Sequence, residues 1–238
     1  MWADSAISKM TDKTTYCRDD LAHILSSAKP NLSGSAFRWT LYNLLREKKL
    51  FRVDYDTYTT VKPKEQPLYR PYYSDKAKAV TELLASRFPE MAFVVIESVL
   101  LNEFLNHQIA QNTIYVQVER DISSYIFDEL REGYAGNVLY KPGSREFDRY
   151  WTRDCVVVLD LITQAPLAQD KPYEITIEKL LVDLVAEKSI SATFSPSEIP
   201  SVYEEAMKRY RVDRHKLLRY AGRRGKTAEV KEYAGEVI

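Results

Sequence analysis

The sequence predicts an α/β fold, with α+β as the alternative, divided into a small N-terminal domain at residues 1–66 and a larger domain at residues 74–238. Three observations support this prediction. Residues 15–61 combine two short helical patterns with a ribbon-like stretch, and three prolines interrupt the chain between Val61 and Ser74. After Ser74, apolar runs of strand length alternate with amphipathic helical patterns, which is typical of a sheet covered by helices.

The N-terminal domain is predicted to contain two helices followed by a β-ribbon. The first helix covers Arg18–Ala28, a turn follows at residues 29–31, and the second helix covers about Ser33–Lys48. The stretch Phe51–Val61 alternates β-branched and aromatic residues, as strands do. Helix, turn, helix and ribbon in this order predict a winged helix, a fold that most often places its second helix in a DNA major groove. The apolar stripe that faces the core of this domain is predicted to contain Phe37, Leu41, Leu44 and Leu45.

The second helix presents a polar face opposite its apolar stripe. Arg38 and Arg46 suit phosphate or guanine, and Asn43 suits adenine. Asp54 and Asp56 near the ribbon tip oppose contact with phosphate. An alternative interpretation of the polar face is a solvated surface with two aromatic rings. The residues expected to contact DNA in this domain are Ser35, Arg38, Trp39, Tyr42, Asn43, Arg46, Lys48, Lys49 and Arg52.

A formal net charge of zero conceals an uneven distribution of charge. Residues 1–70 hold 12 basic against 8 acidic residues, residues 71–207 hold 12 against 22, and residues 208–231 hold 10 against 2. The basic C-terminal segment is therefore expected to extend a positive field toward DNA or toward an acidic patch on a partner. The alternative is that its charges pack against the acidic middle of the chain. The residues in this segment expected to contact DNA are Arg219, Arg223 and Arg224.

The larger domain is predicted from its alternating patterns to contain a sheet of at least four strands, finished by helices. The strands are expected at residues 91–98, 113–119, 137–142 and 155–162. The helices are expected at residues 75–87, 100–106, 121–132 with an Asp cap, 144–150, 175–188, 200–210, 213–220 and 226–233. The helix at 175–188 is expected to be amphipathic, with an inward face made of Ile177, Leu180, Leu181, Leu184 and Val185.

Composition and residue spacing argue against several classes of protein. No apolar run approaches about 20 residues and the N-terminus does not resemble a signal peptide, so we expect a cytoplasmic protein with no membrane partner. Cys17 and Cys155 lie too far apart in sequence for a zinc motif and are expected to be buried thiols. Gly34-Ser35 is not followed by the paired carboxylates of a nucleotidyltransferase.

A metal-dependent nuclease would require acidic residues gathered on neighbouring strands. Candidates exist, but they stand at no recognised spacing, and His107 lacks a nearby nucleophile. We therefore expect no catalytic metal, no cofactor and no enzymatic activity. The acidic candidates are Glu97, Glu119, Asp160 and Glu187. Amides cluster around His107 as possible loop caps or partner contacts, at Asn102, Asn106, Gln108, Gln111 and Asn112.

Four features together resemble the AbiEi family of antitoxins over roughly residues 12–225. They are the winged-helix pattern, the Pro/Tyr-rich segment after the ribbon, the stretch FVVIESVLLNEFLNHQ, and the helix ITIEKLLVDLV, in which residues 180–183 correspond to a leucine-leucine-aspartate motif. The ribbon tip keeps Tyr58 but lacks the glycines of many relatives. The resemblance implies a DNA-binding antitoxin and transcriptional autorepressor of a type IV toxin-antitoxin system.

Such an antitoxin would bind double-stranded promoter DNA at an inverted repeat and would counteract a nucleotidyltransferase-type toxin encoded beside it. A cognate toxin protein is then a possible direct partner. Two alternatives remain open at the level of sequence. One is a nuclease-related enzyme with a variant metal site, and the other is an interaction module that does not bind DNA.

Overall fold

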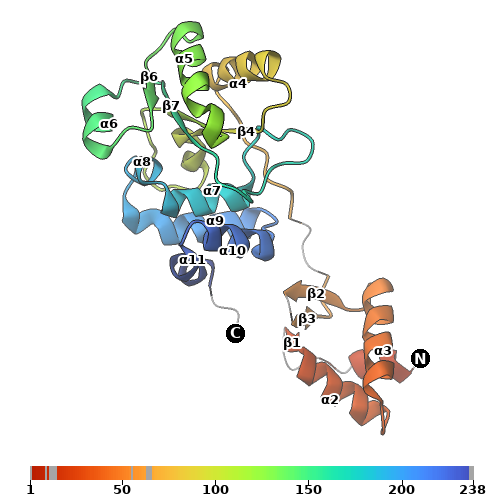
Figure 1. Ribbon diagram of the computed structural model, residues 1–238. Helices are drawn as coiled ribbons and strands as arrows, with labels where there is room; N and C mark the ends of the chain where they lie inside the picture. Colours follow the sequence, from red (N-terminus) through yellow and green to blue (C-terminus); the bar gives the residue numbers. More distant parts are fainter. Residues whose placement is uncertain (1, 9, 11–14, 55, 63–65, 236–238) are drawn as a thin grey trace. The chain divides into compact units, whose positions relative to one another are not determined.

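The computed structural model describes residues 2–8, 10, 15–54, 56–62 and 66–235 of the 238-residue chain. The chain divides into two compact units, which we call unit 1 (residues 1–65) and unit 2 (residues 66–238) (Figure 1). The predicted domains, 1–66 and 74–238, leave residues 67–73 between them and place Gln66 in the first domain. Residues 66–73 belong with unit 2, because Tyr69 and Tyr73 bury their rings in its core.

Unit 1 combines helices with a small antiparallel sheet. Its sheet has the strand order β1-β3-β2, so residues before the first predicted helix complete the ribbon. The expected bounds of the first helix are confirmed, and those of the second are confirmed to within two residues. In chain order the elements are α1 (Trp2–Ile7), β1 (Tyr16–Cys17), α2 (Arg18–Ala28), α3 (Gly34–Arg46), β2 (Phe51–Asp54) and β3 (Thr57–Thr59).

Side-chain caps fix where α2 and α3 begin. The Cys17 thiol accepts a hydrogen bond from the Asp20 N–H, and the Asp20 carboxylate accepts one from the Cys17 N–H. Cys17 is therefore exposed at a helix end, and the expectation of a buried thiol was wrong for this residue; Cys155 is buried as expected. At α3, the Ser33 hydroxyl accepts a hydrogen bond from the Ala36 N–H.

The core of unit 1 forms where α2 and α3 pack on the sheet. Phe37, Leu41 and Leu44 are buried as the helical spacing predicts, while Leu45 is half-buried. Helix α1, which the sequence did not reveal, adds small apolar side chains to the same core. The remaining buried side chains of this core include Tyr16, Leu21, Leu25, Leu50 and Tyr58.

Unit 2 is built on a mixed sheet, which confirms the predicted α/β class. The sheet has the strand order β4-β5-β7-β6, with β4 antiparallel to β5 and the other neighbours parallel. Its strands are β4 (Phe93–Glu97), β5 (Thr113–Val118), β6 (Val138–Tyr140) and β7 (Cys155–Asp160). Its helices are α4 (Asp75–Arg87), η1 (Ser98–Glu103), η2 (Arg120–Ile122), α5 (Ser123–Gly133), α6 (Ser144–Tyr150), α7 (Ile177–Ala186), α8 (Lys188–Ser191), η3 (Pro196–Glu198), α9 (Ile199–Arg209), α10 (Arg214–Arg223) and α11 (Thr227–Ala234).

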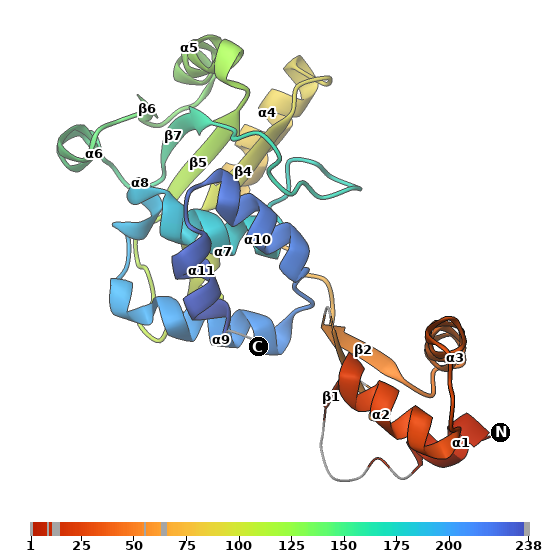
Figure 2. The same cartoon turned by 60° about the horizontal axis from the view of Figure 1, so that its bottom comes forward.

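Helices cover both faces of this sheet. Helices α4 and α5 lie on one face, and α7, α9, α10 and α11 lie on the other (Figures 1 and 2). On β5, the Tyr115 hydroxyl donates to the Ser189 carbonyl and the Gln117 amide donates to Asp183, so both side chains point toward α7 and α8. The chain therefore leaves β5 for α5 on one face, and leaves β7 for α7 on the opposite face.

Three local expectations for unit 2 differ from the structure. The α-helix predicted at residues 100–106 does not form, and the 3₁₀ helix η1 lies there instead. The Asp cap predicted at Asp121 does not form either, because the 3₁₀ helix η2 leads directly into α5. Helix α7 is buried all round rather than amphipathic, since it lies between the sheet and the C-terminal helices. Its buried side chains include Glu178, Lys179 and Asp183.

The outer edge of β4 is covered by residues from elsewhere in unit 2. The Val95 N–H donates to the Tyr173 carbonyl at 3.0 Å, and the Tyr73 hydroxyl donates to the Val95 carbonyl at 2.7 Å. The Ile175 N–H in turn donates to the Tyr73 hydroxyl at 3.1 Å. Both backbone groups of Val95 that face away from β5 are thus satisfied within the chain.

Candidate functional site

The exposed face of α3 carries positive charge and aromatic rings without a carboxylate. Trp39 is 69% exposed and Tyr42 is 61% exposed, and the Arg46 guanidinium lies 5.9 Å from the centre of the Tyr42 ring. Arg38 and Ser35 are exposed on the same face, because positions 35, 38, 39, 42 and 46 follow the helical repeat. The sequence of α3 contains no Asp or Glu. We call the residues Ser35, Arg38, Trp39, Tyr42 and Arg46 the α3 face.

The other unit 1 residues expected to contact DNA differ in availability. Asn43 is half-buried, whereas Lys48 and Arg52 are exposed. Lys49 forms ion pairs with Asp4 at 2.7 Å and with Glu47 at 2.8 Å. These contacts, led by Asp4, raise the pKa of Lys49, so this ammonium is already compensated within unit 1 and the expectation that it grips DNA is not supported by its contacts. Asp56 is exposed, and the side chain of Asp54 lies outside the described residues.

An apolar groove of about 300 Å³ lies beside the α3 face, between α1 and α3. Trp2, Leu32 and Trp39 line it, and the Lys29 ammonium lies 5.3 Å from the centre of the Trp2 ring. Exposed aromatic surface of this kind can pack against a protein as well as against a nucleic acid.

In unit 2, helix α10 carries a row of cations. Lys216, Arg219 and Arg223 recur at i, i+3 and i+7 and are exposed, while Leu217 and Tyr220 on the opposite side are buried. None of the three cations forms an ion pair with any residue in the described part of the chain. We call Lys216, Arg219 and Arg223 the α10 ridge.

Arg224 does not belong to this ridge, contrary to the expectation from sequence. Its side chain is only 9% exposed and lies 3.5 Å from Asp183 and 3.2 Å from Glu187. The guanidinium is therefore committed to an internal ion-pair network, because the helical turn at the end of α10 directs it under the helix and toward α7.

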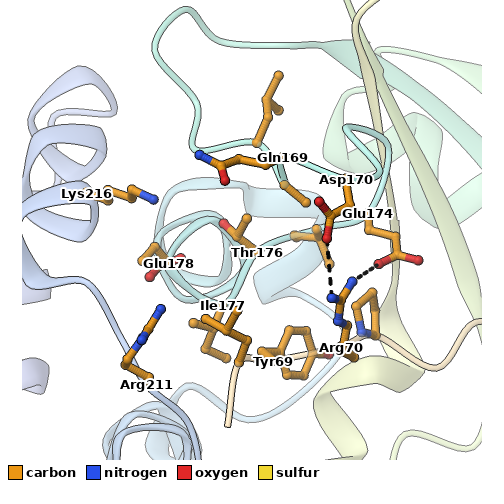
Figure 3. Close-up of a pocket in the computed structure, with 15 residues that line it drawn as sticks. Tyr69, Arg70, Gln169, Asp170, Glu174, Thr176, Ile177, Glu178, Arg211 and Lys216 are labelled. Atoms are coloured by element: carbon orange, nitrogen blue, oxygen red, sulfur yellow. Dashed lines mark ion pairs between the residues drawn. The ribbon is translucent and has the colours of Figure 1, made fainter. Parts of the chain in front are cut away.

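A cavity of about 350 Å³ lies between α7 and the N-terminal end of α10 (Figure 3). Arg211 and Lys216 face it from the side of α10, and Gln169 faces it from the loop before α7 (Figure 3). On another wall, the Arg70 guanidinium forms ion pairs with Asp170 at 3.5 Å and with Glu174 at 3.8 Å. Glu178 also lines the cavity and accepts a hydrogen bond from the Asp213 N–H, so the cavity has no single sign of charge.

A buried polar cluster holds α10 against α7 and the sheet. The Lys179 ammonium, with a fully buried side chain, lies 2.5 Å from Asp183 Oδ2 and 2.5 Å from Gln117 Oε1. The Tyr220 hydroxyl donates to Asp183 Oδ1 at 2.9 Å. Burial lowers the pKa of Lys179, while the adjacent Asp183 carboxylate favours its charged form. This cluster was missed at the sequence level, although Lys179 and Asp183 stand four residues apart in an otherwise apolar helix.

The acidic residues considered as metal ligands lie in separate places. Glu97 is buried and accepts hydrogen bonds from the Ser74 N–H and hydroxyl and from Asn112. Asp160 and Glu187 form ion pairs with basic side chains, and Glu119 is exposed. Within the described ranges, no group of three or more His, Cys, Asp or Glu residues is placed to hold a metal ion.

The amides around His107 serve different neighbours instead of forming one site. The Asn102 side chain exchanges hydrogen bonds with the backbone of Ile109, and Asn112 donates to Glu97. His107 is exposed, and its Nδ1 lies 3.1 Å from Glu198 Oε1. Asn106, Gln108 and Gln111 are exposed, so Asn102 is the amide of this set whose side chain caps the loop.

These features define a two-unit α/β protein, in which a small helix-and-sheet unit precedes a mixed-sheet unit with a basic helix on its surface. The chain belongs to DUF6577, a family of unknown function, whose model matches residues 36–237. No curated protein matches the chain. Among solved structures, the RV2827C protein from Mycobacterium tuberculosis is similar, with 15% identity, coverage of 100% of this chain and 83% of that chain, and a TM-score of 0.35. No helix in the described ranges is long and apolar enough to span a membrane.

Proposed function

We propose that the chain is a sequence-specific DNA-binding transcriptional regulator, with unit 1 acting as a winged helix that docks α3 in the major groove. The α3 face carries this proposal, because it presents two guanidinium groups and two aromatic rings with no opposing carboxylate on the helix. The order of helices and strands in unit 1 supports the same assignment, because β2 and β3 follow α3 and pair with β1 in a three-stranded antiparallel sheet.

The residues of the α3 face differ in what they can recognise. Arg38 and Arg46 can each form paired hydrogen bonds with guanine or contact a backbone phosphate. Trp39 and Tyr42 offer apolar surface for sugars or thymine methyl groups, and the N-terminal end of α3 near Ser35 offers backbone N–H groups to a phosphate. The half-buried Asn43 is placed beside the face and has less freedom to reach a base.

The resemblance to the AbiEi antitoxins adds a biological role to the proposal. In that role the chain acts in the cytoplasm, represses its own promoter and counteracts a nucleotidyltransferase-type toxin without catalysing a reaction. The α10 ridge supplies a second positive surface, suited to flanking promoter DNA or to an acidic patch on the toxin. A toxin gene of that type directly beside this one would support the antitoxin role, and its absence from the neighbourhood would count against it.

The DNA-binding proposal is tested by measuring affinity for the chain's own promoter at several salt concentrations. Arg38→Ala and Arg46→Ala should each weaken binding by about 1–3 kcal/mol if they reach bases, or reduce the salt slope by about one if they contact phosphate. Arg131→Ala removes one exposed charge from α5 and serves as the matched control. A double variant that binds as tightly as wild type at about 150 mM salt would refute groove docking by α3.

The groove between α1 and α3 favours a second candidate function, that of a protein-interaction module. Trp39 lines this groove and is largely exposed, and apolar surface gathered in a groove is typical of protein-interaction sites. If Trp39→Ala abolishes toxin neutralisation while promoter affinity stays unchanged, the interaction function is the correct one for this surface.

A further inference from the structure

The carboxyl ends of β5 and β7 form a second place in the molecule where a ligand can be recognised. The two strands are parallel neighbours, with Val118 opposite Asp160 at their last positions. The chain then leaves β5 for α5 and β7 for α7, on opposite faces of the sheet (Figures 1 and 2). Connections that diverge in this way open a crevice at the strand ends, which is where open α/β sheets bind their ligands.

A cavity of about 750 Å³ occupies this position, within the range of about 300–1,000 Å³ that is usual for small-molecule sites. Glu119, Arg120 and Asp121 contribute its wall after β5, and Asp160 and Thr163 contribute its wall after β7. Arg223, at the end of α10, closes another side, and apolar side chains including Leu161 and Leu167 complete the lining.

Two guanidinium groups in this cavity each have a polar contact with a neighbouring side chain. The Arg120 Nε lies 3.3 Å from Asp160 Oδ2, and the Lys141 ammonium lies 2.6 Å from Asp160 Oδ1. Both oxygens of the Asp160 carboxylate therefore contact a cation. The Lys141 ammonium compensates the negative charge of Asp160, and the same carboxylate orients the Arg120 guanidinium. Arg223 donates to the Thr163 hydroxyl at 2.5 Å. The Arg120 guanidinium meets Asp160 through Nε, and its terminal nitrogens form no hydrogen bond with a described residue, so they are available to an anion.

The backbone around the cavity shows conformations that concentrate at binding sites. Lys141 directly after β6 has a φ of 43°, and Gln164 in the cavity lining has a φ of 64°. Neither residue is a glycine, so both occupy the left-handed region at a cost that the surrounding structure must offset. Glu119 and Asp121 are exposed at the mouth and form no ion pair with a described residue, which leaves their oxygens available to hydroxyl donors.

We propose that this cavity binds a phosphate monoester carried by a small hydroxylated molecule of the nucleoside monophosphate or sugar phosphate class. Arg120 and Arg223 contact the phosphate, since planar guanidinium groups match its oxygens. Glu119 and Asp121 accept hydrogen bonds from the hydroxyl groups, and the apolar wall packs against the ring. This ligand site lies entirely in unit 2 and does not use the α3 face, although it shares Arg223 with the α10 ridge.

The proposal is tested by calorimetric titration of the full chain with adenosine monophosphate, ribose 5-phosphate, inorganic phosphate and adenosine. The two phosphate monoesters should bind saturably and raise the melting temperature, whereas adenosine should not. Arg120→Gln should weaken their binding about tenfold or more, because a charged hydrogen bond is lost. Arg131→Gln, which removes an exposed charge from α5, should leave binding unchanged. Glu119→Gln should weaken the binding of ribose 5-phosphate but not that of inorganic phosphate.

Three results would overturn the proposal. The first is the absence of saturable binding by either phosphate monoester. The second is binding that survives Arg120→Gln and is lost in Lys216→Gln, which would place the anion in the cavity of Figure 3. The third is binding of duplex DNA that Arg120→Gln weakens, together with no binding of the monoesters, which would assign Arg120 and Arg223 to a nucleic-acid backbone.

Discussion

Replacing Asp183 by alanine should strongly destabilise unit 2. Asp183 is fully buried and accepts hydrogen bonds from Lys179 Nζ at 2.5 Å, from the Tyr220 hydroxyl at 2.9 Å and from the Gln117 amide at 3.1 Å. Its removal leaves the Lys179 ammonium buried without a carboxylate, and breaking such a pair costs about 3–5 kcal/mol. Counted another way, three buried donors lose their acceptor, and each unsatisfied donor costs about 1–3 kcal/mol. Because the three donors are neighbours, these costs do not simply add, and the total loss of stability is of the same size. We therefore expect Asp183→Ala to lose about 3–5 kcal/mol of a total that is usually about 5–15 kcal/mol.

Urea unfolding of the full chain, followed by far-ultraviolet circular dichroism, measures this loss in the unit 2 transition. The double replacement Lys179→Met and Asp183→Leu removes both charges and fills the space, so it should cost less than Asp183→Ala alone. Asp128→Ala, at an exposed pair on α5, should cost less than about 0.5 kcal/mol. A loss below about 1 kcal/mol for Asp183→Ala, or an equal loss in the double variant, would refute the argument from uncompensated buried charge.

Three further outcomes are expected. Burial opposes ionisation of Glu198, but hydrogen bonds from the loop at His107 outweigh it and lower the pKa of Glu198 below its usual 4.5. Because the folded-state pKa is the lower one, its contribution to stability is present above about pH 4.5 and is lost as the pH falls through the folded pKa. The melting temperature of Glu198→Gln should therefore lie below that of wild type near pH 7 and approach it in acid. Leu41→Ala should destabilise unit 1 by about 2–4 kcal/mol without moving the unit 2 transition, whereas the exposed Val53→Ala should change little. Titration with Mn²⁺ should leave the melting temperature within about 1 °C, because a hard cation needs several oxygens placed together; a rise that Asp160→Ala abolishes, together with plasmid nicking, would favour a nuclease.

Elements with strong local signals could be predicted from the sequence. Helix α4 begins and ends where the pattern places it, because Ser74 caps its first turn and Phe88-Pro89 follows its last. The strands β4 and β7 were predicted from strongly apolar runs. Strand β1 could not be recognised in the same way, since it has only two residues and exists because they pair with Thr57 and Tyr58.

The candidate sites also contain features that local sequence patterns predict and features that only the fold reveals. The exposure of Trp39 and Tyr42 follows from helical periodicity alone, so the α3 face could be read from the sequence. The ion pair of Lys49 with Asp4 and that of Arg224 with Asp183 each join residues more than 40 positions apart. No local pattern indicates such pairings, and the basic residues that remain without a carboxylate could be identified only once the fold was known.

The covered edge of β4 affects whether molecules of this protein can associate through their sheets at high concentration. An incoming strand would find neither a donor nor an acceptor at Val95, because Tyr173 and Tyr73 already occupy both. The opposite edge strand, β6, is three residues long and is followed directly by Lys141, whose backbone is in the left-handed region. Short or covered edges of this kind prevent sheets from joining across molecules, so we expect the Tyr73 hydroxyl to oppose aggregation as well as unfolding. We expect that loss of the Tyr73 hydroxyl would first be detected as precipitation of the protein during heating.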